Sequence, residues 1–147
     1  MVELWVARHG QTEYNVRGIV QGIVDSPLTT SGINDAMALG RGLAAAGINF
    51  DAAYSSNLRR AVETANLALT AAHQRLTVHK WFGLREQSFG VFEGHSEAQR
   101  AAAMIELTKS TDRFGQPEFT VDQVAELSHV ANCRWGMGGT ESVATIQ

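Results

Sequence analysis

The chain has 147 residues, is 44% hydrophobic and carries a formal net charge of −3 at pH 7, which fits one globular domain over residues 1–147. Its basic residues form no run and are not interleaved with aromatic residues, so nucleic-acid and membrane-surface roles are disfavoured. No apolar stretch could span a bilayer and the first residues lack a signal-peptide pattern, so we expect a cytoplasmic protein without membrane partners.

Cysteine and histidine give no sign of a disulfide or a metal site. Cys133 is the only cysteine, which excludes an internal disulfide and suits a reducing compartment. We interpret it as a structural residue. His73, His95 and His129 have no metal-ligand spacing, so we expect no metal.

The first predicted element is a buried strand over Leu4–Ala7, because consecutive apolar residues suit a strand covered on both faces of a parallel sheet. A polar loop follows at once. Arg8 offers a permanent cation whose planar fork of donors fits phosphate oxygens, and His9 offers a ring nitrogen that can act as a nucleophile or carry a proton. The strand therefore leads into a predicted catalytic loop.

The residues after this histidine are suited to hold an anion. Gly10 lets the backbone approach a ligand closely. The amides of Gln11 and Thr12 can donate to an oxyanion at a strand-to-loop corner. Together with the two preceding side chains, they predict an anion pocket with a nucleophile in it.

Residues 14–26 show little periodicity, which predicts an ordered loop over this pocket. Asn15 and Gln21 lie in it as candidate pocket residues. On spacing alone, the alternative that both are ordinary turn or cap residues is favoured.

A helix is predicted over Ser31–Ala46, with Thr29 or Thr30 as its N-cap and Gly47 at its end. Its apolar stripe consists of Ala36, Leu39, Leu43 and Ala44. A short second strand is predicted over Ala52–Ser55.

The next predicted helix, Leu58–Ala72, begins with two cations. Asn57 is its N-cap candidate. Arg59 and Arg60 in the first turn oppose the helix dipole unless an anion lies nearby, which hints at an arginine for phosphate. Periodicity does not separate the two, and the alternative is a solvated or carboxylate-paired arginine, for which Glu63 is a candidate partner.

A third strand is predicted over Leu76–Trp81, with His79 as a structural residue. Glu86 lies in the loop that follows. If its carboxyl were packed among the neighbouring leucine and phenylalanine side chains, desolvation would favour the protonated form, which could donate a proton to a leaving oxygen. The alternative is a surface glutamate paired with Arg85.

The last predicted elements are a helix over Glu97–Lys109, an insertion over Ser110–Thr120 that shapes substrate access, and a short helix over Val121–His129.

Several motifs resemble, in order, the signature of the histidine phosphatase superfamily, the phosphoglycerate-mutase-like proteins. The matching blocks are Arg8-His9-Gly10-Gln11-Thr12 with Asn15; Gln21-Gly22 followed by Asp25-Ser26-Pro27-Leu28-Thr29 and Gly32; Ser55-Ser56-Asn57-Leu58-Arg59-Arg60-Ala61 with Thr64-Ala65; Leu84-Arg85-Glu86 with Phe89-Gly90-Val91-Phe92-Glu93-Gly94; and Gly138-Gly139-Thr140-Glu141-Ser142.

The resemblance implies an α/β fold, a three-layer α/β/α sandwich around a mostly parallel sheet, without a cofactor. It implies catalytic roles for His9 as nucleophile, Glu86 as proton donor, and Arg8 and Arg60 as phosphate ligands, and it leaves Arg59 on the surface. The substrate-binding residues that it implies are Gly10, Gln11, Thr12, Asn15, Gln21 and Gly22.

The resemblance also implies a helix, a central strand and a second catalytic histidine after the segment 138–142, whereas the sequence stops at Gln147. Val143 and Ile146 start an amphipathic pattern that is too short for a typical helix, which favours a truncated sequence. The alternative is a naturally short or partner-completed protein, which would expose a sheet edge and an apolar face.

Three functions follow from the resemblance. The first is a phosphatase that acts on a small-molecule phosphomonoester through a phosphohistidine at His9, favoured because the segment 89–94 resembles the broad phosphatase branch. The second is a phosphoglycerate mutase. The third, if the chain ends at Gln147, is a phosphate-binding module without turnover. The sequence leaves the oligomeric state open, with a homo-oligomer as one option.

Overall fold

The computed structural model describes residues 2–108. They form two compact units, residues 2–13 with 25–85 and residues 14–24 with 86–108. The single domain stays a prediction. The predicted insertion at 110–120, the helix at 121–129, Cys133 and the motif at 138–142 lie outside the described residues.

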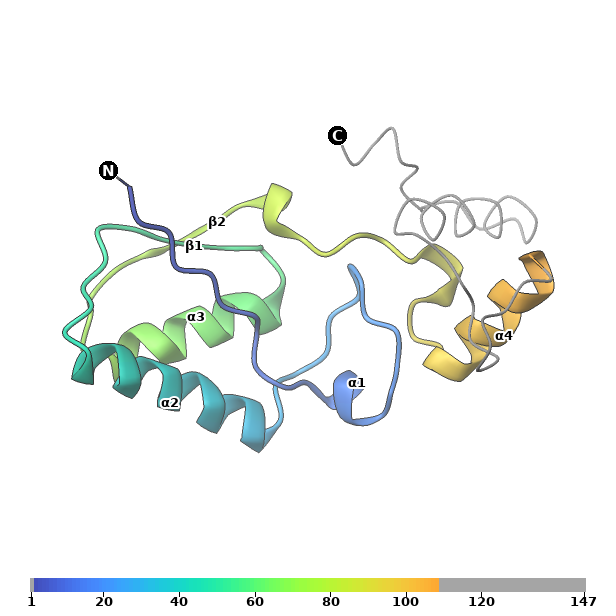
Figure 1. The fold of residues 1–147 in the computed structure, drawn as a ribbon, viewed down its shortest axis with the longest axis horizontal. Coiled ribbons are helices and arrows are strands. Elements are labelled where there is room, and N and C mark those ends of the chain that lie inside the picture. Colours follow the sequence, from blue (N-terminus) through green and yellow to red (C-terminus); the bar gives the residue numbers. More distant parts are fainter. Residues whose placement is uncertain (1, 109–147) are drawn as a thin grey trace. The chain divides into compact units, whose positions relative to one another are not determined.

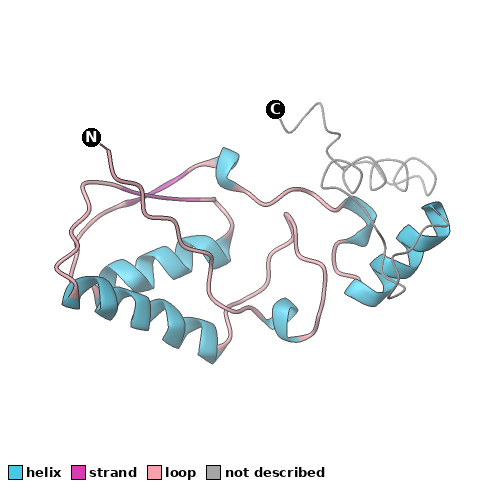
Figure 2. Ribbon diagram, in the orientation of Figure 1, coloured by secondary structure: helices cyan, strands magenta, loops and turns pink. Residues whose placement is uncertain are grey.

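The first unit contains a two-stranded parallel sheet, β1 (Ala53–Ser55) and β2 (Val78–Lys80), in which Ala53 pairs with Val78 and Ser55 with Lys80. Parallel strands need a crossover connection, and α3 (Arg59–Ala71) supplies it. This helix and α2 (Thr30–Ala45) pack side by side, and α3 contacts both strands (Figures 1 and 2). The predicted parallel α/β arrangement is confirmed, with shorter strands than predicted.

Helix α2 begins and ends where local signals predict. The Thr29 hydroxyl accepts a hydrogen bond from the Gly32 amide, and Gly47 follows the last turn with a φ of +69°, a conformation that glycine adopts without strain. The predicted apolar stripe is only partly right, because Leu39 and Ala44 are exposed. Gly32, Ala36 and Gly40 form the buried face instead, since close backbone packing selects small residues over large apolar ones.

Helix α3 also lies where predicted, but its cap is different. Leu58, not Asn57, is the N-cap residue, and it makes no side-chain capping bond. The Asn57 side-chain oxygen instead accepts a hydrogen bond from Nε of Arg85. At the other end, His73 follows the helix with a φ of +59° and its amide bonds to the Thr70 carbonyl at 3.1 Å.

The predicted buried strand at Leu4–Ala7 is wrong for the described residues. The segment is not a strand, and Leu4 and Val6 are 81% and 85% exposed. An apolar run indicates a strand only where neighbours supply hydrogen-bond partners and cover, and no segment within residues 2–108 pairs with this one. The Trp5 ring makes an edge-to-face contact with Phe50, with ring centroids 6.4 Å apart.

A one-turn helix, η1 (Phe82–Leu84), follows β2. Helix α1 (Glu13–Val16) leads from the first unit into the second. The second unit also contains η2 (Gly90–Phe92) and α4 (Glu97–Thr108), which confirms the predicted helix that begins at Glu97. No helix in the described part of the chain has the length and apolar character needed to span a membrane.

The second unit is held together around a few buried side chains and main-chain bonds. Val20 and Phe92 are buried apolar residues of this unit. The Val20 amide donates to the His95 carbonyl at 2.8 Å. Ser96 and Gln99 form a reciprocal cap at the start of α4, in which each side chain accepts the other residue's amide hydrogen bond at 3.1 Å and 2.9 Å.

Candidate active site

The imidazole of His9 is held by its own loop. Its Nδ1 lies 2.8 Å from the carbonyl oxygen of Gly10. A carbonyl oxygen can only accept, so Nδ1 carries the hydrogen and Nε2 keeps its lone pair. The ring therefore presents Nε2 as the basic, nucleophilic nitrogen, which is the form that the predicted chemistry requires.

The surroundings favour the neutral imidazole. Burial lowers the pKa of His9 below its ordinary value of 6.5, and the positive charges of Arg60 and Arg8 lower it further. The hydrogen bond to the Gly10 carbonyl and the negative charge of Asp25 oppose this shift without reversing it. A lowered pKa keeps the lone pair on Nε2 available at neutral pH.

The backbone of Gly10 is fixed against both helices. Its amide donates to Oγ1 of Thr64 in α3 at 3.0 Å, and the same hydroxyl donates to the Arg60 carbonyl at 2.7 Å. A Cβ atom on Gly10 would lie 2.4 Å from the carbonyl oxygen of Gly32 in α2. The sequence predicts close approach to a ligand at this glycine, and the structure shows close approach to a helix.

The two residues after Gly10 connect the loop to the start of α2. Side-chain Oε1 of Gln11 accepts from the Thr29 hydroxyl at 2.9 Å, and the Gln11 carbonyl accepts from the Thr29 amide at the same distance. Thr12 is fully buried and forms an isolated antiparallel bridge with Leu28. The predicted donation of both amides to an oxyanion stays a prediction.

The anion expected near the two cations in the first turn of α3 is a carboxylate of the same chain. Asp25 forms an ion pair with Arg60, whose Nη1 lies 3.2 Å from Oδ1. It also accepts hydrogen bonds from the backbone amides of Arg59 and Arg60. The unfavourable placement of two cations at a helix N-terminus is thus offset by a residue 34 positions earlier in the chain.

The two neighbouring arginines have different surroundings. The Arg60 side chain is 3% exposed, whereas that of Arg59 is 74% exposed and pairs with Glu63 at 3.5 Å. This confirms the placement of Arg59 on the surface and of Glu63 as its partner.

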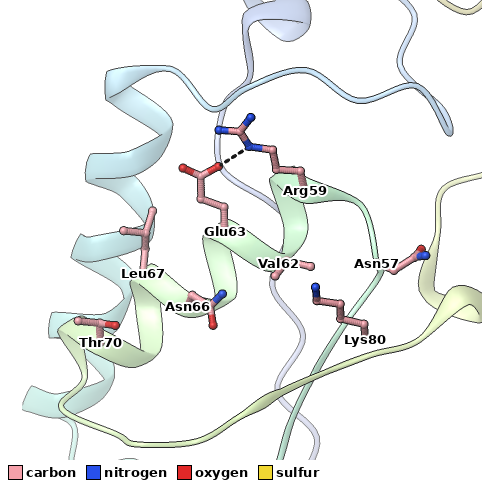
Figure 3. A pocket seen from close by; sticks show the side chains of 8 residues that line it. All are labelled: Asn57, Arg59, Val62, Glu63, Asn66, Leu67, Thr70 and Lys80. Carbon is pink, nitrogen blue, oxygen red and sulfur yellow. Dashed lines mark ion pairs between the residues drawn. The ribbon is translucent and has the colours of Figure 1, made fainter.

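Arg59 and Glu63 face a surface hollow of about 490 Å³ along α3 (Figure 3). Its other lining residues are Asn57, Val62, Asn66, Leu67, Thr70 and Lys80. None of the lining residues is a predicted catalytic residue, so the hollow is a separate feature of the helix surface.

The remaining predicted site residues belong to the second unit, apart from the exposed Arg8. Asn15 lies in α1 and its carbonyl accepts from the Gly18 amide at 3.2 Å, while Gln21 is half-buried. Gly22 is buried, and a Cβ atom on it would lie 2.3 Å from the Gln87 carbonyl oxygen. Their roles in substrate binding stay predictions.

Glu86 differs from its predicted surroundings. The residue is exposed, and Oε1 of its carboxylate accepts from the following backbone amide, that of Gln87, at 3.0 Å. Leu84, expected to cover it, is 48% exposed. The predicted desolvation is therefore wrong for this structure, because the carboxylate is not packed among apolar side chains. The predicted role as proton donor is untested.

Glu93 organises the second unit and was not singled out from the sequence. Its carboxylate accepts from the amides of Ile23, Val24 and Phe89 at 3.1, 2.6 and 3.0 Å, and from the Ser88 hydroxyl at 3.2 Å. An acidic residue within an apolar, glycine-containing stretch is the signal that could have identified it. In the sequence, Thr64 and Asp25 likewise stand out only as parts of the family motifs.

No group of three or more His, Cys, Asp or Glu side chains within residues 2–108 is arranged to hold a metal ion.

Comparison with known proteins identifies the family of this chain. Residues 4–129 match the family described as the histidine phosphatase superfamily (branch 1). A 2,3-bisphosphoglycerate-dependent phosphoglycerate mutase of Streptococcus agalactiae is 41% identical over 102 residues, which are 69% of this chain and 44% of that protein. The chain thus spans less than half the length of this relative.

Solved structures of phosphoglycerate mutases and phosphatases superpose on this chain. The phosphoglycerate mutase from Bacillus anthracis superposes with a TM-score of 0.81 at 34% identity, over 94% of this chain and 59% of that one. A mycobacterial glucosyl-3-phosphoglycerate phosphatase superposes with a TM-score of 0.57 at 27% identity, over 93% and 67% of the two chains. Both mutases and phosphatases therefore share the fold.

Proposed function

Because this chain belongs to the histidine phosphatase superfamily, we propose that the protein is an enzyme that transfers the phosphoryl group of a small-molecule phosphomonoester to His9 and then to water. The observation that carries the proposal is the imidazole of His9, whose Nδ1 is bound to the Gly10 carbonyl while its pKa is lowered. A neutral ring with a free Nε2 lone pair is the nucleophile that such a transfer needs.

In the first step, the Nε2 lone pair attacks phosphorus and the ester P–O bond breaks, with its electron pair leaving on the alcohol oxygen. The hydrogen stays on Nδ1 and keeps donating to the Gly10 carbonyl oxygen, which stabilises the positive ring that forms. Arg8 and Arg60 stabilise charge on the nonbridging oxygens. We assign the proton for the leaving oxygen to the Glu86 carboxyl, by the match of this residue to the family motif.

In the second step, a water oxygen attacks phosphorus and the P–N bond breaks, with its electron pair returning to Nε2. The proton of the water goes to the Glu86 carboxylate, which restores the acid. Free phosphate and the neutral imidazole are the products. Dividing the reaction into two transfers replaces one difficult displacement by two easier ones.

The test is hydrolysis of an aryl phosphate by the wild type, by His9→Ala and by His79→Ala. The control histidine is exposed in β2, with its ring 5.3 Å from that of Tyr54. We expect His9→Ala to lose about 1000-fold or more of the rate and His79→Ala to keep it. Brief incubation with labelled substrate should leave an acid-labile, alkali-stable label on the protein only when His9 is present.

A phosphoglycerate mutase is the second candidate, favoured by the sequence relatives of that name. A mutase must return the phosphoryl group to a hydroxyl and exclude water. Label from a phosphoglycerate should then appear in an isomeric phosphoglycerate rather than in inorganic phosphate.

A protein that binds inorganic phosphate without His9-dependent turnover or label would overturn both enzyme proposals. The phosphate-binding module would remain as its function.

A further inference from the structure

We propose that Asp25 is a positioning residue for the phosphoryl transfer, holding the guanidinium of Arg60 in place before a phosphate arrives. The inference rests on the proposed function, since it assumes that Arg60 acts on the phosphoryl oxygens. In this proposal Asp25 acts through Arg60 and does not contact the substrate.

The Asp25 carboxylate contacts both the backbone nitrogen and the guanidinium of Arg60. Oδ1 lies 3.2 Å from Nη1 of the guanidinium and 3.4 Å from the backbone nitrogen of the same residue. Oδ2 accepts from the amide of the preceding residue, Arg59. One carboxylate thus joins the main chain and the tip of a long side chain, which restricts the rotamers open to Arg60.

The second observation is the difference in burial. The Arg60 side chain is 3% exposed and that of Asp25 is 27% exposed. A cation withdrawn from water needs a counter-charge. Arg59, which has its own partner in Glu63, is 74% exposed and has no such need. The carboxylate therefore serves the arginine that is buried.

The third observation concerns the helix. The N-cap residue of α3, Leu58, makes no side-chain capping bond, so Asp25 supplies from a distant segment what a local Ser, Thr, Asn or Asp usually supplies. The carboxylate fixes the first turn of α3 and the side chain that leaves this turn together. Any shift of Asp25 would move both.

The fourth observation links this pair to the nucleophile. The charges of Arg60 and Asp25 both act on the pKa of His9, in opposite directions, so both lie within electrostatic reach of the imidazole. Stabilising a phosphoryl transition state is most effective when the cations are already in position and need no reorganisation. The geometry of Asp25 provides such preorganisation for Arg60.

The test separates the charge of Asp25 from its capping role. Asp25→Asn keeps an oxygen for the helix amides but removes the negative charge, whereas Asp25→Ala removes both. Glu63→Gln is the matched control, because it removes the carboxylate from the neighbouring exposed pair. Each variant is studied in the full chain, below its melting temperature and after its far-UV circular dichroism is shown to be that of the wild type.

Two measurements are made on each variant. The first is the solvent exchange of the Arg60 guanidinium hydrogens by NMR in the unliganded protein, which does not depend on activity. The second is kcat and KM for an aryl phosphate. For Asp25→Asn we expect faster exchange at Arg60 and a fall in kcat/KM of about 10- to 100-fold, because misplacing a positioning group by about 1 Å can cost about 100-fold. Glu63→Gln should change neither quantity.

Asp25→Asn with wild-type kcat/KM would overturn the proposal, whatever the exchange measurement gives. An unchanged exchange rate of the Arg60 guanidinium hydrogens would overturn the proposal as well, because Asp25 would then only cap the first turn of α3 and would not hold the guanidinium. A wild-type protein without turnover would instead overturn the proposed function. Faster exchange in Asp25→Asn would in that case still establish that Asp25 holds Arg60.

Discussion

Replacing Thr64 by valine removes one hydroxyl while keeping the shape of the side chain. Thr64 is 6% exposed, and its Oγ1 accepts from the Gly10 amide at 3.0 Å and donates to the Arg60 carbonyl at 2.7 Å. Valine leaves the half-buried Gly10 amide without this partner, and an unsatisfied donor withdrawn from water costs about 1–3 kcal/mol. The bond to Arg60 adds little, since a helix carbonyl at this position also receives the main-chain amide four residues later.

We therefore expect Thr64→Val to lower the free energy of unfolding by about 1–3 kcal/mol, measured by urea denaturation followed by far-UV circular dichroism. Thr70→Val in the same helix is the control, because Thr70 is exposed and surface substitutions usually stay within about 0.5 kcal/mol. If Thr64→Val also stays within about 0.5 kcal/mol of the wild type, the hydroxyl does not hold the loop as described.

Two further predictions use the same loop and helix. NMR titration should give His9 a pKa below 6.5, because burial disfavours its charged form. The contribution of the neutral ring to folding stability is then present above pH 6.5 and lost as the pH falls through the folded-state pKa. A pKa at or above 6.5 would contradict this. Gly32→Ala should destabilise the protein by about 1–3 kcal/mol, because its Cβ would lie 2.2 Å from the Gln11 carbonyl oxygen. Gly42→Ala, which meets nothing within 4 Å, should stabilise it by about 0.5–1 kcal/mol in the same denaturation experiment, and equal effects of the two substitutions would refute the packing argument.

Features that depend on neighbouring residues could be predicted from the sequence. The bounds of α2 and α3 are right to within one residue, because a cap at Thr29, a glycine after the last turn and amphipathic spacing are local signals. The difference between Arg59 and Arg60 came from the resemblance to the family, since helical periodicity gives adjacent residues no distinguishing mark.

Features that depend on distant segments could not be predicted. Nothing near α3 indicates that Asp25 accepts hydrogen bonds from its first amides, because the two are far apart in the chain and a carboxylate in a loop has many potential partners. The apolar run at residues 4–7 predicted burial, which only a covering segment can provide. The exposure of Glu86 depends on tertiary placement, which has no periodic signal in the sequence.

Because the buried face of α2 consists of small residues, substitutions on this face and on the exposed face of the helix have different effects. Gly32 lies against the His9 loop, and Gly40 lies against α3, where a Cβ would come within 2.1 Å of the Ala68 carbonyl oxygen. A main-chain carbonyl is the nearest atom at both contacts, so the distances from α2 to the loop and from α2 to α3 are set by how closely the backbones approach. The exposed positions of α2, such as Met37 and Arg41, can therefore carry labels or surface attachments, whereas a side chain at Gly32 or Gly40 would meet a main-chain carbonyl.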